Sequence, residues 1–461
     1  MKKIRLFFLS LAVAFSACNV LDQKPQTEID TQAFFVDAPA AEAAMVNVYN
    51  DMLGSFNANY LVAADWPADI CFPSRYFVPF FTDFTQLASR SFNAFNGAVG
   101  SIWGDSYRTV RNANFVLENV PRVPDGAFRP GRKAEILAEA HCLRALTYFY
   151  LVRFFGDVPL VLATPTDVSI SANQVPRTPS AQVYQQILAD LAIAERDLPA
   201  SYATFAETKG RVTKWFAKAL LARVHLTLKN HQLAADKAQE VIGSGQFVLV
   251  DDYALLYRNP GNSTESIFEL QYTARQSNAL SAFIYQAIGA GFHDRVDASG
   301  DPIVSNTQPV NAFVNSFVLT DKRRNPTFIA EFGTNYGIRK YEAFRTGDDN
   351  IIIARLAEMV LTRAEALNEL GQTPEALVLC NRIRSRAGIA ALVLSGQNDV
   401  REAIWEERKK ELCYEGHRWF DLLRTGKIAE KTTFTNPDRW RMPIPQNEMN
   451  VNPQLTQNPG Y

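Results

Sequence analysis

Helical periodicity is the strongest constraint on the fold of this 461-residue chain. Apolar residues recur at three- and four-residue spacing in several blocks, which is the pattern of helices with a buried face. The blocks are residues 134–155, 182–198, 213–229, 233–242, 354–370, 374–387 and 400–414, with a continuation or restart after Gly416. Gly156 and Pro199 follow the first two blocks, where helices commonly end. The sequence therefore predicts an all-α fold with a few short strands.

Two pairs of blocks match the helix–turn–helix pattern of tetratricopeptide repeats. The later pair carries Val360, Ala364, Leu367, Gly371, Ala376, Cys380 and Ile383 at the expected offsets, and the earlier pair fits more loosely through Ala222, His225, Ala234, Ala238 and Val241. In such repeats each helix pair stacks on its neighbours. Because a long stretch separates the two pairs, the sequence predicts dispersed helix pairs in a scaffold with large insertions rather than a continuous repeat array.

The insertions are predicted near 50–100 and 245–345. The first contains the stretch DWPADICFPSRYFVPFFTDF, residues 65–84, which has seven aromatic residues and three prolines. Proline removes a backbone donor and breaks helices, so neither a helix nor an unbroken strand is expected there. The second insertion contains a short β-like piece, SIFELQYT.

The N-terminus has the pattern of a lipoprotein signal peptide. Cations precede a short apolar run, and small residues lie directly before Cys18. We expect cleavage after residue 17 and acyl chains on Cys18, which would anchor a single domain of residues 18–461. An ordinary signal peptide with an incidental cysteine is the alternative. No later stretch reaches the length of a membrane span.

Composition and motifs exclude several classes of function. The formal net charge is −1, which does not favour a nucleic-acid partner. Cys71, Cys142, Cys380 and Cys413 have no close spacing and are expected to be isolated buried thiols. No histidine lies in a metal-binding pattern, so no metal or other cofactor is expected. Calcium in the loops 251–262 or 300–306 is a weaker alternative, since neither follows an EF-hand pattern.

The block ERKKELCYEGHRWFD, residues 407–421, is the densest group of charges that resembles a catalytic site. Arg408, Glu411, Glu415 and Arg418 are 3, 4 and 3 residues apart, which places alternating charges on one helical face. Carboxylates flanked by arginines stay ionised, whereas paired catalytic carboxylates need diverging pKa values. We therefore expect a structural charge clamp and no catalytic residue. Nucleotide-binding and hydrolase motifs are also absent.

Ligand-binding candidates come from the aromatic residues. The stretch 65–84 either fills the core, docks a partner or forms a platform for sugar rings. Its phenylalanines, Phe72, Phe80, Phe81 and Phe84, are expected to be structural. Trp66 and Tyr76 are better ligand candidates, because a flat ring with a polar edge stacks on a sugar and hydrogen-bonds its hydroxyls. Asp65, Asp69, Arg75 and Asp83 offer polar groups nearby, and Tyr336 and Tyr341 form a second, weaker pair.

Segments along nearly the whole chain resemble the SusD/RagB family of nutrient-uptake lipoproteins. They are LDQKP (21–25), NANFVLENV (112–120), 138–161, 210–230, AFVNSFVLTDKRR (312–324), 355–371, NRIRSRAG (381–388), 407–427 and 442–461. Their order, behind a lipoprotein cysteine, makes the resemblance specific. The least matched segments are 50–100 and 272–310.

The resemblance implies a fold and a function. It implies a helical fold built on tetratricopeptide pairs, with irregular regions as the ligand surface. It also implies a non-catalytic role at the cell outer membrane: capture of oligosaccharides or peptides and closure over a SusC-like TonB-dependent transporter. It transfers no binding residue. An anchored polysaccharide-degrading enzyme and a peptide-binding tetratricopeptide scaffold are the alternatives.

Overall fold

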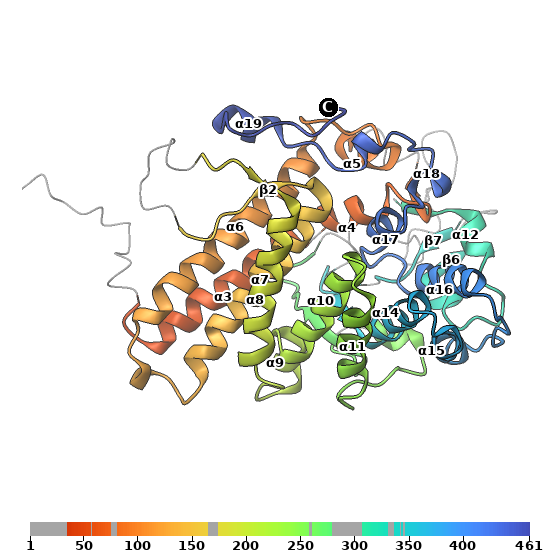
Figure 1. The fold of residues 1–461 in the computed structure, drawn as a ribbon, viewed down its shortest axis with the longest axis horizontal. Helices are drawn as coiled ribbons and strands as arrows, with labels where there is room; N and C mark the ends of the chain where they lie inside the picture. The colour runs from red at the N-terminus through yellow and green to blue at the C-terminus, as the bar shows by residue number, and fades with distance from the viewer. Residues whose placement is uncertain are drawn as a thin grey trace, which may run out of the picture.

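The computed structural model describes residues 35–56, 58–74, 81–164, 174–257, 261–278, 307–330, 336–341, 343 and 346–461. Its longer helices are α3 (Ala38–Ser55), α6 (Gly97–Asn119), α7 (Arg132–Phe155), α8 (Ser180–Asp197), α10 (Lys214–Thr227), α11 (His231–Ile242), α14 (Leu356–Glu369), α15 (Thr373–Arg386) and α16 (Gln397–Glu411). The shorter helices are α4 (Ala58–Asp65), α5 (Thr82–Ser89), α9 (Phe205–Gly210), α12 (Asn311–Asn315), α13 (Arg324–Thr327), α17 (Arg418–Thr425), α18 (Ile428–Lys431) and α19 (Gln446–Val451). The expected mainly helical fold is confirmed (Figure 1).

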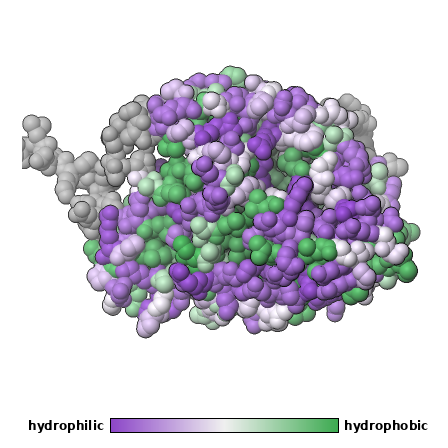
Figure 2. Space-filling model, in the orientation of Figure 1, coloured by the Kyte–Doolittle hydropathy of each residue, from purple (hydrophilic) through white to green (hydrophobic). Residues whose placement is uncertain are grey.

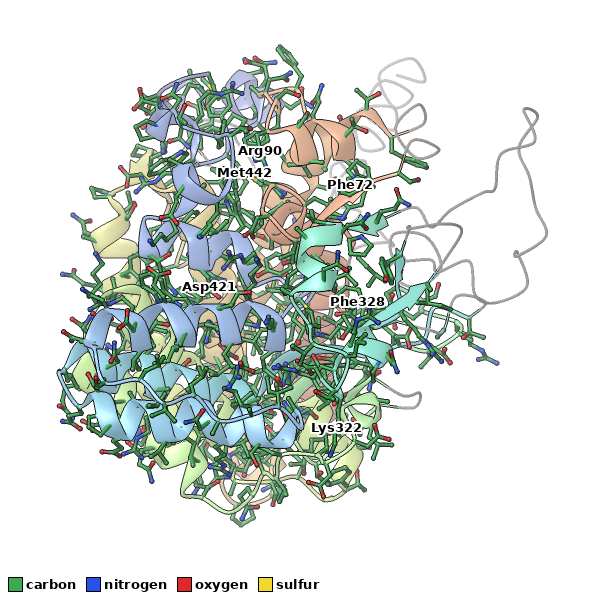
Figure 3. The ribbon with its side chains drawn as sticks, turned by 90° about the vertical axis from the view of Figure 1, so that its right-hand side faces the viewer. Phe72, Arg90, Lys322, Phe328, Asp421 and Met442 are labelled. Carbon is green, nitrogen blue, oxygen red and sulfur yellow. The ribbon has the colours of Figure 1, made fainter. Side chains whose placement is uncertain are left out.

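The strands are short and form two-stranded antiparallel pairs. They are β1 (Cys71–Pro73) with β5 (Thr307–Pro309), β2 (Val158–Pro159) with β3 (Arg177–Thr178), β4 (Ser266–Leu270) with β8 (Ile351–Arg355), and β6 (Phe328–Ala330) with β7 (Tyr336–Ile338). β4 is the β-like piece expected from the sequence. Phe72 on β1 and Phe328 on β6 lie on the same side of the molecule (Figure 3).

The two predicted helix pairs stack on each other in space. α10 packs on α11, α11 on α14, and α14 on α15, so the chain between the pairs loops out without interrupting the stack (Figure 1). Gly371 turns α14 into α15 with φ +80°, a left-handed conformation that glycine adopts without strain. α7 and α8 pack together at one end of this stack and α16 packs at the other.

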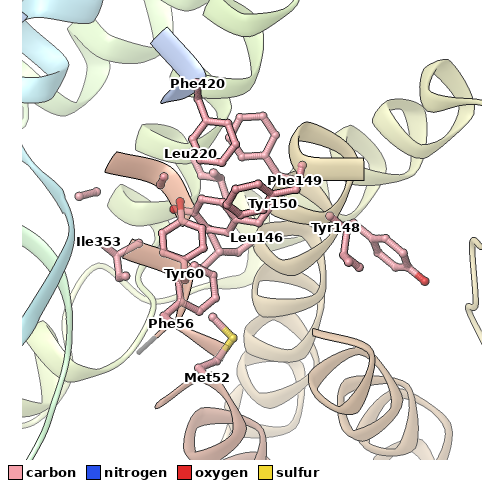
Figure 4. Packing of buried hydrophobic residues seen from close by; sticks show 14 of the residues in the cluster. Met52, Phe56, Tyr60, Leu146, Tyr148, Phe149, Tyr150, Leu220, Ile353 and Phe420 are labelled. Atoms are coloured by element: carbon pink, nitrogen blue, oxygen red, sulfur yellow. The ribbon is translucent and has the colours of Figure 1, made fainter. Parts of the chain in front are cut away.

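The largest buried cluster joins distant parts of the chain. It contains hydrophobic residues from Phe35 to Leu455. Near its centre, Tyr60, Tyr150 and Phe420 from three different helices pack with ring centroids 4.5–6.4 Å apart (Figure 4). This aromatic packing fixes α4, α7 and α17 against one another.

The segment 50–100 is more regular than the sequence indicated. α4, α5 and the start of α6 lie within it, and β1 falls inside the proline-rich stretch. Pro67 lies in a turn and Pro73 ends β1, so these two prolines interrupt the stretch without preventing short elements on either side, while Pro79 lies outside the described residues. No helix among the described residues combines the length and the apolar character needed to cross a membrane.

Candidate functional site

An open surface cavity of about 530 Å³ lies where α4, α5 and α6 meet. It is lined by Asn59, Phe81, Thr82, Asp83, Phe84, Gly97, Ala98 and Ser101, all of which except Ala98 are at least partly exposed. Two aromatic rings lie here beside amide, hydroxyl and carboxylate groups, a combination that suits a small-molecule site. We call it the α5–α6 cavity.

The aromatic part of the α5–α6 cavity is a pair of nearly parallel rings. The ring centroids of Phe81 and Phe84 lie 6.3 Å apart and their planes differ by 26°. Phe84 also packs edge-on against Trp66, with 6.1 Å between centroids. Because Trp66 belongs to the core, it fixes the inner side of the ring pair while the outer side stays partly exposed.

The polar part is held by the first turn of α6. Asn96 caps this helix, since its Oδ1 accepts a hydrogen bond from Val99 N at 3.0 Å. Its Nδ2 donates to the backbone oxygen of Asp83 at 2.9 Å and so ties α5 to α6. A Cβ atom at Gly97 would lie only 2.6 Å from Asp83 Oδ2. Glycine at this position therefore lets the carboxylate approach the positive end of the α6 dipole.

Two arginines fix the turn that follows α4. Arg90, labelled in Figure 3, donates from Nε to Pro67 O at 2.7 Å and from Nη2 to Ala68 O at 3.2 Å. Arg418 donates to both carboxylate oxygens of Asp69, at 2.6 and 2.8 Å. Bidentate pairs of this kind are strong and directional. The turn after α4 is thus held by the C-cap of α5 and by the start of α17.

The structure corrects the role expected for Trp66. Its side chain is only 1% exposed, so it fills the core beneath Phe84 and is not accessible to a ligand. The preceding residue, Asp65, is also fully buried and accepts a hydrogen bond from Gly416 N at 3.1 Å. Burial raises the pKa of Asp65 to about 7.

The other ligand candidates from the sequence differ in whether the structure describes them and in how accessible they are. Arg75 and Tyr76 lie outside the described residues, so their role stays a prediction. Tyr341 is 3% exposed and donates to Tyr414 O at 2.9 Å, which makes it a core residue instead of a ligand contact. Tyr336 is partly exposed, and its hydroxyl accepts a hydrogen bond from Arg324 at 3.1 Å.

The four residues of the expected charge clamp are buried, but they do not share one helical face. α16 ends at Glu411, and α17 begins only at Arg418. Between them Tyr414 and Gly416 have positive φ values of 63° and 76°, which no α-helix can contain. The predicted single face is therefore wrong, because the turn sends Glu415 and Arg418 in new directions.

The carboxylates of this block pair with cations from other elements. Arg323 and Arg355 lie 3.0 and 2.6 Å from Glu411. Glu415 lies 2.6 Å from Lys340 and 2.8 Å from Arg355. We define the buried charge cluster as Glu265, Arg323, Lys340, Arg355, Arg386, Glu411 and Glu415, all buried and joined by ion pairs.

Electrostatics in the buried charge cluster keep the acids ionised. Burial alone would raise the pKa of Glu415, but Arg355 and Lys340 outweigh it and lower the value to about 2. Burial likewise opposes ionisation of Glu411, and Arg386, Arg355 and Arg323 lower its pKa below the usual range. A general acid needs a proton near neutral pH. These two glutamates therefore serve as counter-ions that join separate elements.

The side chains that commonly bind metals do not form a metal site within the described residues. Cys71, Cys142, Cys380 and Cys413 are buried free thiols, as expected. No group of three or more histidine, cysteine, aspartate or glutamate side chains within the described ranges has the arrangement of a metal site. The calcium candidate 300–306 lies outside those ranges.

Phe81, Phe84 and Asn59 line the cavity, although none of them is a ligand candidate on the sequence alone. Phenylalanine has no polar edge and is expected in the core, whereas the partial exposure of these rings follows from the packing of α5 on α6. One signal was present: Asn96 and Gly97 precede a helix with apolar residues at three- and four-residue spacing. An N-cap there would have predicted a helix start directly beside the aromatic stretch.

Comparison with known proteins places the chain in a family. Residues 21–226 match the family described as starch-binding associating with outer membrane, and residues 334–436 and 425–461 match the SusD family. SusD-like protein P38 of Formosa agariphila is 26% identical, covering 99% of this chain and 98% of its own.

Two further proteins extend the comparison. The starch-binding protein SusD of Bacteroides thetaiotaomicron is 23% identical over 82% of this chain and 81% of its own length. The solved structure of a laminarin-binding SusD-like protein superposes with a TM-score of 0.79 at 26% identity, covering 93% of this chain and 100% of the other. The family matches, the relatives and the shared helical fold all indicate the same family. The chain belongs to the SusD-like family.

Proposed function

We propose that this protein is a non-catalytic surface lipoprotein that captures glycans and delivers them to a TonB-dependent transporter of the outer membrane. The single observation that carries the proposal is the α5–α6 cavity, where the ring pair of Phe81 and Phe84 lies beside Asp83 and Asn59. Aromatic faces pack on the apolar faces of sugars, and a few oriented polar groups bind their hydroxyls.

The relatives support a carbohydrate ligand. One is named a starch-binding protein and another a laminarin-binding protein, and one matching family is described as starch-binding. Starch and laminarin are both glucose polymers, so α-linked and β-linked glucans are the first ligands to test. The same family description, association with the outer membrane, supports the location.

The ligand is tested by titrating malto-oligosaccharides, laminari-oligosaccharides and unrelated peptides into the full chain by calorimetry. We expect a sugar to bind, and amide hydrogen exchange to slow in α5 and in the first turn of α6 but not in α9. Binding of peptides without sugars would contradict the proposal. So would protection confined to helices outside the α5–α6 cavity.

The anchor and the partner are tested in cells. Replacing Cys18 with Ala removes the thiol that would carry the lipid, so the variant is expected in the fraction without membranes when the transporter is deleted. An intact lipoprotein is expected to co-purify with the transporter. A Cys18→Ala protein that still sediments with membranes in the deletion strain would overturn the anchor.

A further inference from the structure

A second cavity, of about 470 Å³, lies beside α17. It is lined by Val152, Arg153, Ser180, Tyr184, Thr227, Phe420, Leu423, Arg424, Pro437, Asp438, Trp440, Arg441, Asn458 and Pro459. The end of α7, the start of α8 and the C-terminal segment 437–459 form its walls. Figure 2 shows this face hollowed beneath the C-terminal segment, with hydrophobic residues among hydrophilic ones. We call it the Arg153 cavity.

Arg153 has no counter-ion among the residues that the structure describes. Its guanidinium carbon lies 3.8 Å from the ring centroid of Phe420, 4.0 Å from Phe149 and 4.4 Å from Tyr150. Nε donates to Phe149 O at 3.2 Å, while Nη2 is buried and has no hydrogen-bond partner among the described residues. By contrast, the buried Arg223 pairs with Glu358 at 2.6 Å. A buried donor without a hydrogen-bond partner lowers the stability of the fold. An anion bound in this cavity would supply that partner for Arg153.

The remaining charges leave this cavity positive. Arg424 is neutralised by Glu365 at 2.8 Å and Asp421 at 2.9 Å. Arg441 is exposed, lies against Gly156 and forms no ion pair with any described residue. Asp438 is the one carboxylate in this lining, whereas Arg153 and Arg441 both face it, and Arg441 interacts with Asp157 only at longer range. The whole chain has a formal net charge of −1, so this excess is local.

Aromatic rings make up the rest of the binding surface. Trp440 is partly exposed, and its indole N–H donates to Phe434 O at 2.9 Å, which fixes the ring. Tyr184 is partly exposed on the opposite wall. A fixed aromatic face beside two guanidinium groups that form no ion pair with a described residue matches a ligand that has both an apolar ring face and a negative group.

We propose that the Arg153 cavity is a second ligand site, which binds an acidic sugar unit through Arg153 and Arg441 and packs its ring on Trp440. The negative group is a carboxylate, as in a uronic acid, or a sulfate ester. That the ligand is a sugar rests on the proposed function. The two sites differ in chemistry, since the α5–α6 cavity presents a carboxylate and the Arg153 cavity presents cations.

The test uses the full chain and three probes of equal length: a neutral gluco-oligosaccharide, an oligogalacturonate and a sulfated galactan oligosaccharide. At low salt, at least one acidic probe is expected to bind, and Arg441→Gln is expected to weaken that binding about tenfold through loss of a charge-assisted contact. Arg153→Met, which keeps the apolar stem between the rings, is expected to act in the same direction. Arg196→Gln, an exposed arginine at the far end of α8, is the matched control.

The outcomes separate the two proposals. The acidic probe that binds more tightly identifies the group as carboxylate or sulfate. Phe81→Ala should leave acidic-probe binding at the Arg153 cavity unchanged, and Arg441→Gln should leave neutral-probe binding unchanged. Failure of both acidic probes to bind, or equal binding by wild type and Arg441→Gln, overturns the second site whether or not neutral glycans bind.

Discussion

In the buried charge cluster each carboxylate touches two or more cations, whereas Asp83 in the α5–α6 cavity forms no ion pair with any described residue. Ion pairing fully occupies the oxygens of Glu411 and Glu415 and holds α16 against β8 and α15. The Asp83 side chain is partly exposed and keeps acceptor capacity for a ligand. A high density of charges along the sequence thus indicates a structural cluster in this protein, whereas a few polar groups beside partly exposed rings indicate the candidate site.

The largest expected effect comes from breaking the buried charge cluster. Glu411→Ala leaves Arg323, Arg355 and Arg386 without a shared counter-ion and should lower the free energy of unfolding by about 3–5 kcal/mol. Glu406→Ala, on the exposed side of α16, should change it by less than about 0.5 kcal/mol. Urea unfolding measures both. A stable Glu411→Ala protein that no longer binds glycan would move the ligand site into this cluster.

A similar loss is expected from the base of the α5–α6 cavity. Trp66→Ala removes a fully buried ring and should cost about 3–5 kcal/mol through the cavity it leaves. Phe72, which is 44% exposed in the same stretch, should tolerate alanine with little loss of melting temperature. If Trp66→Ala melts like wild type but loses glycan binding, the assignment of this tryptophan to the core is wrong.

The two regions should respond oppositely to pH. Glu415 has a lowered pKa in the folded state, so its stabilisation is present above about pH 4.5 and is lost as the pH falls towards 2. Asp65 has a raised pKa of about 7, so its contribution is most favourable below the unfolded value of 3.8 and is lost as the pH rises through 7.

Asp65→Asn should therefore gain melting temperature relative to wild type between pH 4 and pH 8. Thermal melts of both proteins across this range measure the difference. A constant difference between them would show that Asp65 titrates normally in the folded protein.

Local pattern predicted the helices better than it predicted their ends or the site. The blocks 213–229 and 233–242 became α10 and α11 almost unchanged. By contrast, the spacing predicts a helix that includes Ala354 and Arg355, but both residues belong to β8, because they pair with β4 across a long loop. Such pairing depends on tertiary contacts that spacing does not encode.

The candidate site was located by region but not by residue. Aromatic density pointed to 65–84, and the cavity lies at the end of that stretch. Burial of Trp66 depends on how α4 packs against α5, and the partial exposure of Phe81 depends on how α5 packs against α6. Residue type alone therefore favours Trp66 over Phe81 and Phe84 as a ligand contact, whereas the two phenylalanines are the more accessible side chains.

The most direct test of the central claim is a calorimetric titration of the best-binding glycan into wild type, Phe81→Ala and Phe205→Ala. Phe205 is an exposed phenylalanine on α9, remote from α5, and serves as the matched control. An aromatic contact contributes about 0.5–1.5 kcal/mol, so Phe81→Ala should weaken binding about two- to tenfold with little change in melting temperature. Phe205→Ala should bind like wild type. Equal affinity of all three proteins would contradict the assignment of the α5–α6 cavity as the glycan site.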